Sequence, residues 1–387
     1  MKTFINIVLW FLILSFLSSC GRSQGTGTEN EGTTVVRIDP MREDEVSAFD
    51  YFSDIRLIPL EGSSPEAFLS SALFKIIVTD AFIFVLDQRD NRILCFDADG
   101  KWLQTVDKNG RGTGEFSLSS DFIFDRRDST LVVLDPRGKI LKYAAEPGLP
   151  FVKQFDVSSY VRATHTLTTL GDEDFLLYSD TEDRPMFIFE SATQSCRPVD
   201  YHSPSWLSGL YSYTETPFLH ESDSIYFYEG LDGELFQFDA TSGFLRKVLR
   251  WDFGKYSFDV NKLEPNKDAY YYLNFWLSNS DRWVTPVVIK FIAESSIFLH
   301  FFFKKAWKHM VYNQKSKTYV CFTSFKEGGV FENKPGCGQT GCEYLLVSPE
   351  FIPKVLSREM LRDPASLQAF DNLKETDNHY LVVYTLK

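Results

Sequence analysis

The sequence predicts an all-β protein, a six-bladed β-propeller with about four strands in each blade. A strand–turn–strand pattern returns about every 48 residues, and the 387-residue chain is rich in aromatic residues, with 36 Phe. Aromatic residues favour strands, and a repeat of about 40 to 50 residues is typical of propeller blades. A pair of β-sandwiches is the rival architecture, and the regular spacing disfavours it.

The two clearest copies of the repeat lie near the start of the chain. Residues 83–87 and 92–101 read as two strands joined by a polar turn, and residues 131–135 with 139–143 repeat the pattern. Asp87 and Asp135 occupy the same place in the two copies and are 48 residues apart. A single unit of this kind cannot bury both of its faces, so we expect the copies to pack side by side.

Four weaker copies complete the series: residues 175–178 with 186–189, 225–228 with 235–239, 297–301 with 309–312, and a last copy that begins at 344–347. The fifth copy follows the fourth by 72 residues, about half a period too late. We therefore predict an insertion at residues 256–283, with helical spacing in its middle. In the last copy, a partly helical segment at 357–374 precedes a strand at 379–384.

The two ends of the repeating region predict how the ring closes. The last copy reaches Lys387 with one strand missing, and either residues 35–38 or residues 55–61 can supply that strand from the N-terminal side. Closure of this kind joins two frayed ends in one sheet and removes an exposed edge.

The N-terminus has the pattern of a bacterial lipoprotein signal. Lys2 precedes an apolar run at 4–16, and residues 17–21 read Leu-Ser-Ser-Cys-Gly. We predict a signal peptide at 1–19, a lipid on Cys20, a flexible tether at 20–34 and a propeller at 35–387. The run is too short for a span of about 20 residues, although an uncleaved anchor and an ordinary secretory peptide are alternatives. The predicted location is the cell envelope, with the outer membrane favoured.

Charge and cysteine content narrow the classes of partner. The formal net charge of −13 argues against binding to nucleic acid.

Cys337 and Cys342 flank a glycine-rich turn, and in an exported domain we predict that they form a disulfide. A zinc site would need two more soft ligands, which do not lie close by in sequence. Cys95 and Cys321 lie in apolar strand patterns typical of buried thiols.

The linker after the first copy carries a family resemblance. Residues 108–116, Lys-Asn-Gly-Arg-Gly-Thr-Gly-Glu-Phe, follow residues 96–103 and resemble the inter-blade linker of NHL-repeat propellers. The chain is also similar to six-bladed β-propeller lipoproteins of Bacteroidetes, in its opening at 58–61 and its ending at 382–387. The resemblance covers 35–387 and weakens in the third, fifth and sixth copies, which lack the glycine-rich linker. It implies a fold and a compartment more than an activity.

The glycines of this linker have a physical role of their own. They allow tight turns between the outer strand of one blade and the inner strand of the next. A phosphate-binding loop would need a helix N-terminus behind the glycines, whereas this stretch leads into a strand-like segment at 122–124. We therefore do not expect a nucleotide site.

Acidic residues at strand ends are the weak candidates for a metal site. Asp87 and Asp135, with Asp125, could face a calcium ion or a substrate in the channel, because a propeller brings residues about 48 apart to one axis. Caps of β-turns are the favoured interpretation of these carboxylates. We therefore expect no cofactor, with calcium as the alternative.

Aromatic residues in two irregular segments are the candidate binding residues. They are Trp206, Tyr211 and Tyr213 between the third and fourth copies, and Tyr271 and Trp276 in the insertion. Rings with a polar edge suit the recognition of proteins or sugars. The alternative, held equal, is that the insertion buries its rings as a lid on the propeller.

The expected function is that of a monomeric, membrane-anchored, non-catalytic propeller that binds a protein or glycan partner. The alternative is a metal-assisted lyase or lactonase with a cation in the channel, which would need a ring of carboxylate, Asn or His side chains on the axis. No Gly-x-Ser-x-Gly or His-Glu-x-x-His motif supports a hydrolase.

Overall fold

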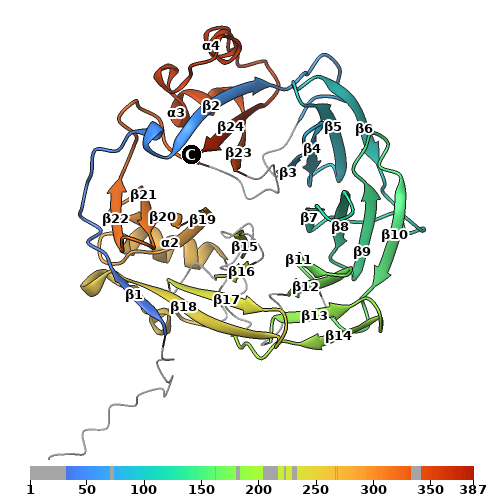
Figure 1. Ribbon diagram of the computed structural model, residues 1–387, viewed down its shortest axis with the longest axis horizontal. Coiled ribbons are helices and arrows are strands. Elements are labelled where there is room, and N and C mark those ends of the chain that lie inside the picture. The colour runs from blue at the N-terminus through green and yellow to red at the C-terminus, as the bar shows by residue number, and fades with distance from the viewer. Residues whose placement is uncertain are drawn as a thin grey trace, which may run out of the picture. The chain divides into compact units, whose positions relative to one another are not determined.

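The computed structural model describes residues 32–69, 74–161, 163–179, 184–203, 217–221, 224–228, 233–265, 267, 269–293, 295–332 and 341–387. The chain divides into residues 1–33 and a compact unit from Thr34 to Lys387. Within this unit six sheets lie around a central axis as the blades of a propeller (Figure 1). The predicted six-bladed all-β fold is therefore confirmed.

The first three blades are regular four-stranded sheets. Blade 1 contains β3 (Phe74–Val78), β4 (Phe82–Asp87), β5 (Arg92–Asp97) and β6 (Trp102–Asp107). Blade 2 contains β7 (Asp121–Asp125), β8 (Thr130–Asp135), β9 (Lys139–Ala144) and β10 (Phe151–Asp156). Blade 3 contains β11 (Thr166–Gly171), β12 (Asp174–Tyr178), β13 (Met186–Glu190) and β14 (Ser195–Pro198). In each blade the first strand lies nearest the axis and the last lies at the rim (Figure 1).

The other three blades depart from this plan. Blade 4 contains β15 (Phe218–Glu221), β16 (Ser224–Phe227), β17 (Glu234–Asp239), β18 (Phe244–Asp252) and a fifth strand, β1 (Thr34–Arg37). Blade 5 contains β19 (Val287–Ala293), β20 (Ser296–Phe303), β21 (Ala306–Asn313) and β22 (Thr318–Phe322). In the described residues blade 6 has three strands, β23 (Cys342–Val347), β24 (Tyr380–Leu386) and β2 (Phe52–Pro59), instead of the expected four.

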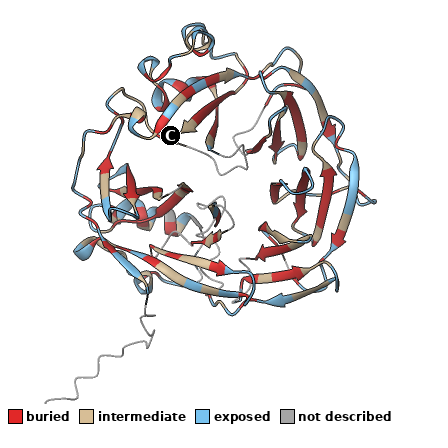
Figure 2. Cartoon of the chain, in the orientation of Figure 1, coloured by how far each residue is buried: buried red, intermediate tan, exposed pale blue. Residues whose placement is uncertain are grey.

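The hydrophobic core lies between neighbouring blades. Five of the six residues of β4 are buried, whereas only one residue of the rim strand β10 is buried (Figure 2). Leu86 of blade 1 shares one apolar cluster with Leu131 and Val133 of blade 2. Because each blade buries its faces against its neighbours, the ring must close to protect the first and last blades.

The N-terminal strand closes the ring. β2 pairs antiparallel with β24, and Ile55 lies opposite Tyr384. The prediction that an N-terminal strand completes the last blade is confirmed for residues 55–61. The other segment considered, residues 35–38, belongs elsewhere: Thr34–Arg37 runs parallel to β18 of blade 4, where the outer edge offers its unpaired backbone groups.

Residues 34–59 form a continuous N-terminal belt around the rim of blades 4, 5 and 6 (Figure 1). After β1, the backbone N–H of Asp44 donates to the carbonyl of Cys321 over 2.7 Å, and the N–H of Cys321 donates to the Asp44 carboxylate over 2.9 Å. Glu43 forms an ion pair with Lys308 at 2.9 Å. A 3₁₀ turn (Ala48–Asp50) then leads the belt into β2.

Helices occupy two irregular places in the chain. The predicted insertion carries two 3₁₀ turns (Gly254–Tyr256 and Val260–Lys262) and α2 (Ala269–Asn279), which confirms the helical spacing. Blade 6 carries α3 (Ile352–Val355), α4 (Pro364–Asp371) and two 3₁₀ turns (Pro349–Phe351 and Arg358–Met360). None of the described helices has the length and apolar character needed to cross a membrane.

Helix α4 covers the outer edge of β2, where a fourth strand would otherwise lie. Asp363 caps its N-terminus by accepting a hydrogen bond from the N–H of Ser366 over 3.0 Å. The Ser366 hydroxyl accepts a hydrogen bond from the N–H of Leu57 over 2.8 Å. The Ser366 side chain thus pairs with a backbone N–H that would otherwise be unpaired at the edge of the sheet. Another strand can therefore not form a hydrogen bond at this point.

Candidate functional site

Helix α2 is anchored to the propeller by one of its faces. Tyr272 and Trp276, four residues apart and therefore on one side of the helix, are buried in the apolar cluster that contains Phe218 and Phe227 of blade 4. The Tyr272 hydroxyl also donates to the carbonyl of Glu264 over 3.0 Å. These contacts fix the helix rigidly and determine which side chains it presents outward.

A ladder of half-buried rings runs along the next side of the helix. The centroids of Tyr271 and Phe275 are 6.4 Å apart, and those of Phe275 and Trp283 are 5.9 Å apart with the planes only 14° from parallel. The ammonium group of Lys267 lies 5.6 Å from the Tyr271 ring, and that of Lys262 lies 4.7 Å from the Trp283 ring. The ring faces are therefore engaged by one another and by two cations.

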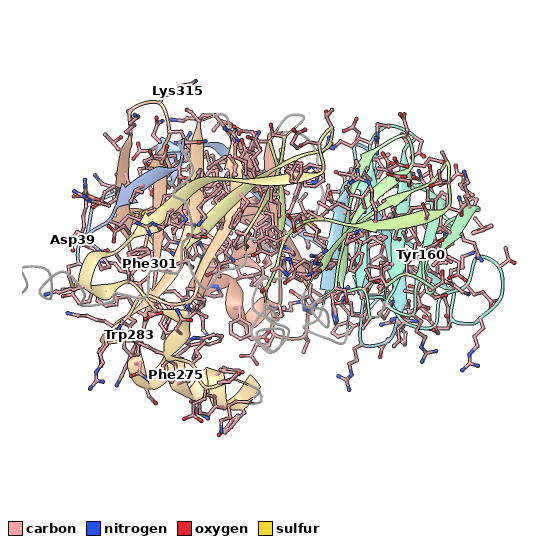
Figure 3. The ribbon with its side chains drawn as sticks, turned by 90° about the horizontal axis from the view of Figure 1, so that it is seen from below. Asp39, Tyr160, Phe275, Trp283, Phe301 and Lys315 are labelled. Atoms are coloured by element: carbon pink, nitrogen blue, oxygen red, sulfur yellow. The ribbon has the colours of Figure 1, made fainter. Side chains whose placement is uncertain are left out.

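The outward side of α2 exposes large apolar side chains. Tyr270 is 72% exposed and Leu277 is 46% exposed, with Asn274 between them in the helical repeat. Figure 3 shows the helix, labelled at Phe275, projecting from one face of the disc beyond the ends of the blade strands. A projecting helix with an exposed Tyr and Leu is the kind of surface that protein interfaces use.

The predicted binding residues fall into three groups. Tyr271 belongs to the half-buried ladder, while Trp276 is only 2% exposed and anchors the helix, as the lid interpretation expects. Trp206, Tyr211 and Tyr213 lie outside the described residues. Sequence reasoning did not single out Tyr270 and Leu277 as the exposed pair, because the pattern of three consecutive tyrosines does not show which one faces the core.

The inner strands of blades 1–3 are joined by a buried polar network. Lys75 of β3 forms an ion pair with Asp121 of β7. The same carboxylate accepts hydrogen bonds from the Thr166 hydroxyl and, over 2.9 Å, from the N–H of Leu167 in β11. All four groups are buried. The Asp121 carboxylate on the inner strand β7 is thus engaged by residues of both neighbouring blades.

His220 extends this inner region to blade 4. Its Nε2 lies 2.5 Å from the hydroxyl of Thr168 in β11. The side chain is exposed, yet desolvation by the surrounding blades, followed by the charge of Arg126, lowers the pKa of His220 to about 4. The ring is therefore neutral at physiological pH and forms a neutral link between blades 3 and 4.

The acidic residues proposed for calcium serve as turn partners. Asp135 accepts hydrogen bonds from the N–H groups of Ser117 and Arg137, over 2.8 and 2.9 Å. Asp87 lies 3.6 Å from Arg92 across its hairpin, and burial raises the pKa of Asp87. Asp125 pairs with the buried Lys142 at 3.4 Å. Among the described residues, no group of three or more His, Cys, Asp or Glu side chains is arranged to hold a metal ion.

A buried histidine pair in blade 5 was missed by the sequence analysis. The Nδ1 of His309 lies 2.8 Å from the Nε2 of His300, and Glu332 lies 3.7 Å from His300. Burial lowers the pKa of His300 well below its usual value and that of His309 to about 3. The two residues are opposite each other across a hairpin, so a correct register would have revealed the pair.

The thiols do not form a site in the described part of the chain. Cys95, Cys196, Cys321 and Cys342 are free there. Burial raises the pKa of Cys95, Cys196 and Cys321 to about 12, so these thiols stay protonated. Cys20 and Cys337 lie outside the described residues. The lipid on Cys20 and the bridge between Cys337 and Cys342 therefore stay predictions.

Comparison with solved structures agrees with the propeller fold. A protein of Bacteroides fragilis described as exported has a similar structure, with a TM-score of 0.69, 15% identity, and coverage of 92% of this chain and all of the other. Virginiamycin B lyase from Staphylococcus aureus reaches a TM-score of only 0.42 at 12% identity, over 75% of this chain and 81% of the lyase, which supports no inference.

Residues 33–385 match the family described as domain of unknown function DUF4934, and the chain belongs to that family. No curated protein matches the sequence.

Proposed function

We propose that this chain is a lipid-anchored, non-catalytic propeller of the cell envelope that binds a protein partner through the outward side of α2. The observation that carries the proposal is the exposure of Tyr270 and Leu277 on a helix that projects from one face of the disc. Since Tyr272 and Trp276 hold this helix against blade 4, the surface is rigid before binding and loses little conformational entropy on association.

A protein fits this surface better than a glycan. In the ladder the faces of Tyr271, Phe275 and Trp283 already engage one another or a lysine, so these rings offer a sugar little surface for stacking. Tyr270 and Leu277 lie beside the ladder and suit an apolar patch of a partner. Lys262 at one end of the ladder favours a partner with an acidic rim, while Lys267 at the other end pairs with Glu264 at 3.0 Å.

The inner strands support a binding role over the lyase or lactonase alternative. A cation in the channel would need carboxylates that are free to coordinate it. The Asp121 carboxylate, which lies on an inner strand, is engaged by Lys75 and by Thr166 of the adjacent blades. The contacts of the Asp121 carboxylate therefore suit a structural link between blades 1, 2 and 3.

Two observations support the envelope location. The N-terminal sequence ends its apolar run at Cys20 in the manner of a lipoprotein signal, and the similar Bacteroides fragilis protein is described as exported. We expect the substitution Cys20→Ala to abolish labelling by a radioactive fatty acid, while the matched Cys196→Ala variant keeps it. Labelling that persists in the Cys20→Ala protein would rule out this lipid site.

Site-specific crosslinking in the native cells tests the α2 surface. A photoreactive amino acid at position 270 should give one discrete crosslinked product, and a second substitution, Leu277→Asp, should abolish it. The control is the same amino acid at position 244, because Phe244 is 59% exposed but lies on the outer strand β18. A product of equal yield from both positions, or none from position 270, would contradict the proposal.

A further inference from the structure

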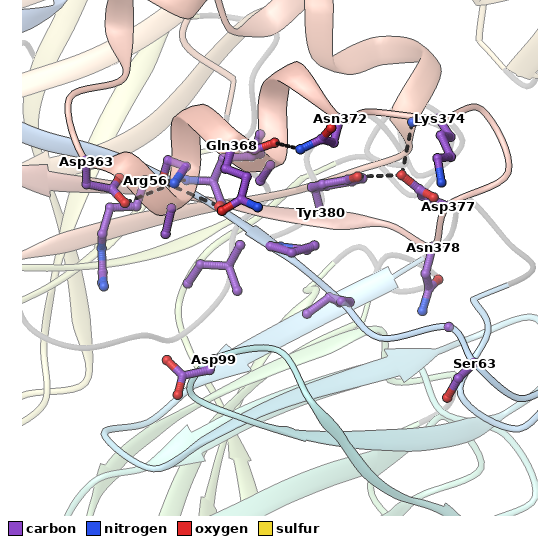
Figure 4. Close-up of a pocket in the computed structure, with 18 of the residues that line it drawn as sticks. Arg56, Ser63, Asp99, Asp363, Gln368, Asn372, Lys374, Asp377, Asn378 and Tyr380 are labelled. Carbon is purple, nitrogen blue, oxygen red and sulfur yellow. Dashed lines mark hydrogen bonds between the residues drawn. The ribbon is translucent and has the colours of Figure 1, made fainter.

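A groove separate from α2 lies at the seam between blades 6 and 1 (Figure 4). It has a volume of about 760 Å³, within the range of ligand sites, and it is open along one side. Helix α4 and the loop at 372–378 form one wall. β2 lies directly beneath α4, and residues 60–63 and the hairpin tip at Asp99 lie across from the helix.

The floor of the groove is held by buried polar side chains. The Asn378 amide donates to the carbonyls of Glu61 and Ala67 over 3.0 and 2.9 Å, and its oxygen accepts from the N–H of Leu69 over 3.1 Å. The Tyr380 hydroxyl donates to Asp377 over 2.7 Å. The bonds of Asn378 join residues that are about 310 positions apart in sequence, so the groove exists only once the ring is closed.

Charged side chains of both signs line the groove, with an excess of one negative charge. Arg56 and Lys374 supply two positive charges, and Asp99, Asp363 and Asp377 supply three negative charges. Gln368 and Asn372 add exposed amides from α4 and its end. An anionic ligand would meet three carboxylates, and a strongly cationic ligand would meet the guanidinium and ammonium groups. The lining therefore favours an uncharged ligand that is rich in hydrogen-bonding groups.

An extended peptide is a poor occupant of the same groove. A peptide usually binds a sheet edge through backbone hydrogen bonds, but the Ser366 hydroxyl already occupies the N–H of Leu57 on the edge of β2. Leu57, Leu60 and Tyr380 are buried beneath the surface, which leaves Ile58, Pro59 and two alanines as the apolar residues of the lining that a peptide side chain could reach. Carboxylates, amides and a guanidinium are, by contrast, suited to vicinal hydroxyl groups.

We infer that the groove between α4 and the hairpin tip at Asp99 binds a neutral oligosaccharide. The site is independent of the protein interface proposed on α2 and adds a second ligand to the same molecule. Asp99 and Gln368, on opposite walls, hydrogen-bond the sugar hydroxyls. The exposed small side chain of Ala365 gives the chain of sugars room to lie along α4.

Saturation-transfer NMR of the purified protein with neutral hexasaccharides of glucose, mannose, xylose and N-acetylglucosamine tests this inference. At least one should give a saturable signal, and an equimolar hexauronate or acidic hexapeptide should give none. Gln368→Ala and Asp99→Ala should each weaken binding by tenfold or more, and Ala365→Trp should abolish it by filling the groove.

Matched controls keep this test separate from folding and from the α2 proposal. Glu146→Ala alters an exposed carboxylate in the corresponding hairpin of blade 2, away from the groove, and should leave binding unchanged. All variants should keep the parental melting temperature. Absence of binding by every neutral hexasaccharide, or binding that survives Ala365→Trp, would overturn the inference. Neither outcome affects crosslinking at position 270.

Discussion

The two halves of the ring are held together in different ways. Blades 1–3 are joined near the axis, where Asp121 of blade 2 bonds to Lys75 of blade 1 and to Thr166 of blade 3. Blades 4–6 are joined at the rim, where the N-terminal belt pairs with β18, crosses blade 5 and ends as β2 beside β24. Side-chain ion pairs and hydrogen bonds connect the blades of the first half, whereas the second half is connected mainly by backbone pairing of the belt with strands at its two ends.

This difference indicates where sequence variation is tolerated. In blades 1–3 the inner polar residues Lys75, Asp121 and Thr166 follow one another at intervals of 46 and 45 residues, so an insertion between them would disturb the network. In blades 4–6 the belt provides the connection, and this half contains both α2 and α4. The proposed protein interface on α2 therefore lies on the half that the belt secures, and the groove lies where that half meets blade 1.

Removing the belt should have the largest effect. Deletion of residues 35–61 removes β1 and β2 and exposes the apolar clusters of blades 5 and 6, which contain Phe52 and Ile55. We expect the loss of the cooperative thermal transition, followed by circular dichroism. A protein that lacks these residues and still melts cooperatively at the parental temperature would show that the ring closes without the belt.

The inner network should give the next largest effect. Asp121→Ala leaves Lys75 buried without its carboxylate, and breaking a buried ion pair costs about 3 to 5 kcal/mol. The double change Lys75→Met, Asp121→Leu should recover part of that loss. Chemical denaturation measures both. Glu173→Ala, which breaks the exposed pair with Lys153, is the control and should cost less than about 1 kcal/mol; equal losses would contradict the network's role.

Acid should destabilise the belted half through its histidine pair. Burial keeps His300 and His309 neutral in the folded state, whereas the unfolded chain binds protons below about pH 6.5. The contribution of this neutral pair to the free energy of unfolding is therefore fully present above pH 6.5. It falls as the pH drops toward about 3, the pKa of His309. The slope is about 1.4 kcal/mol per pH unit for each ring.

Thermal melts between pH 7.5 and 5 measure this loss. The double change His300→Phe, His309→Phe should reduce the slope of the pH dependence relative to the parent, because it removes two titrating rings and leaves His220, whose pKa is also lowered. His202→Gln, at an exposed site, should leave the slope unchanged. A slope in the double variant equal to that of the parent would assign the acid sensitivity to other groups.

The turn carboxylates should have the smallest effect. Asp87→Ala and Asp135→Ala should each cost about 1 kcal/mol, the usual contribution of a side-chain hydrogen bond, because Asp135 bonds to Ser117 and Arg137 within the fold. Neither a chelator nor added calcium should shift the melting temperature. A large reversible calcium shift that disappears in the double variant would restore the metal-site alternative.

Local patterns made much of the fold predictable. Hairpins such as residues 83–87 with 92–101 carry their own turn and strand signals, and the helical spacing at 256–283 indicated α2. The belt was only half predictable, because residues 35–38 and 55–61 have similar strand character and only the packed rim decides which sheet each joins. The His300–His309 pair depends on the exact register of its hairpin, and the groove depends on contacts between residues about 310 positions apart. One sequence reveals neither.

Hydrogen–deuterium exchange of the mature protein tests the central claim, closure of the ring by the belt, most directly. The account predicts that peptides covering β2 (Phe52–Pro59) and β24 (Tyr380–Leu386) are as strongly protected as β8 (Thr130–Asp135), because all three are paired inside the closed ring. β1 should exchange sooner, as a short strand at an outer edge. Exchange of β2 before β8, at the rate of β1, would contradict closure by this strand.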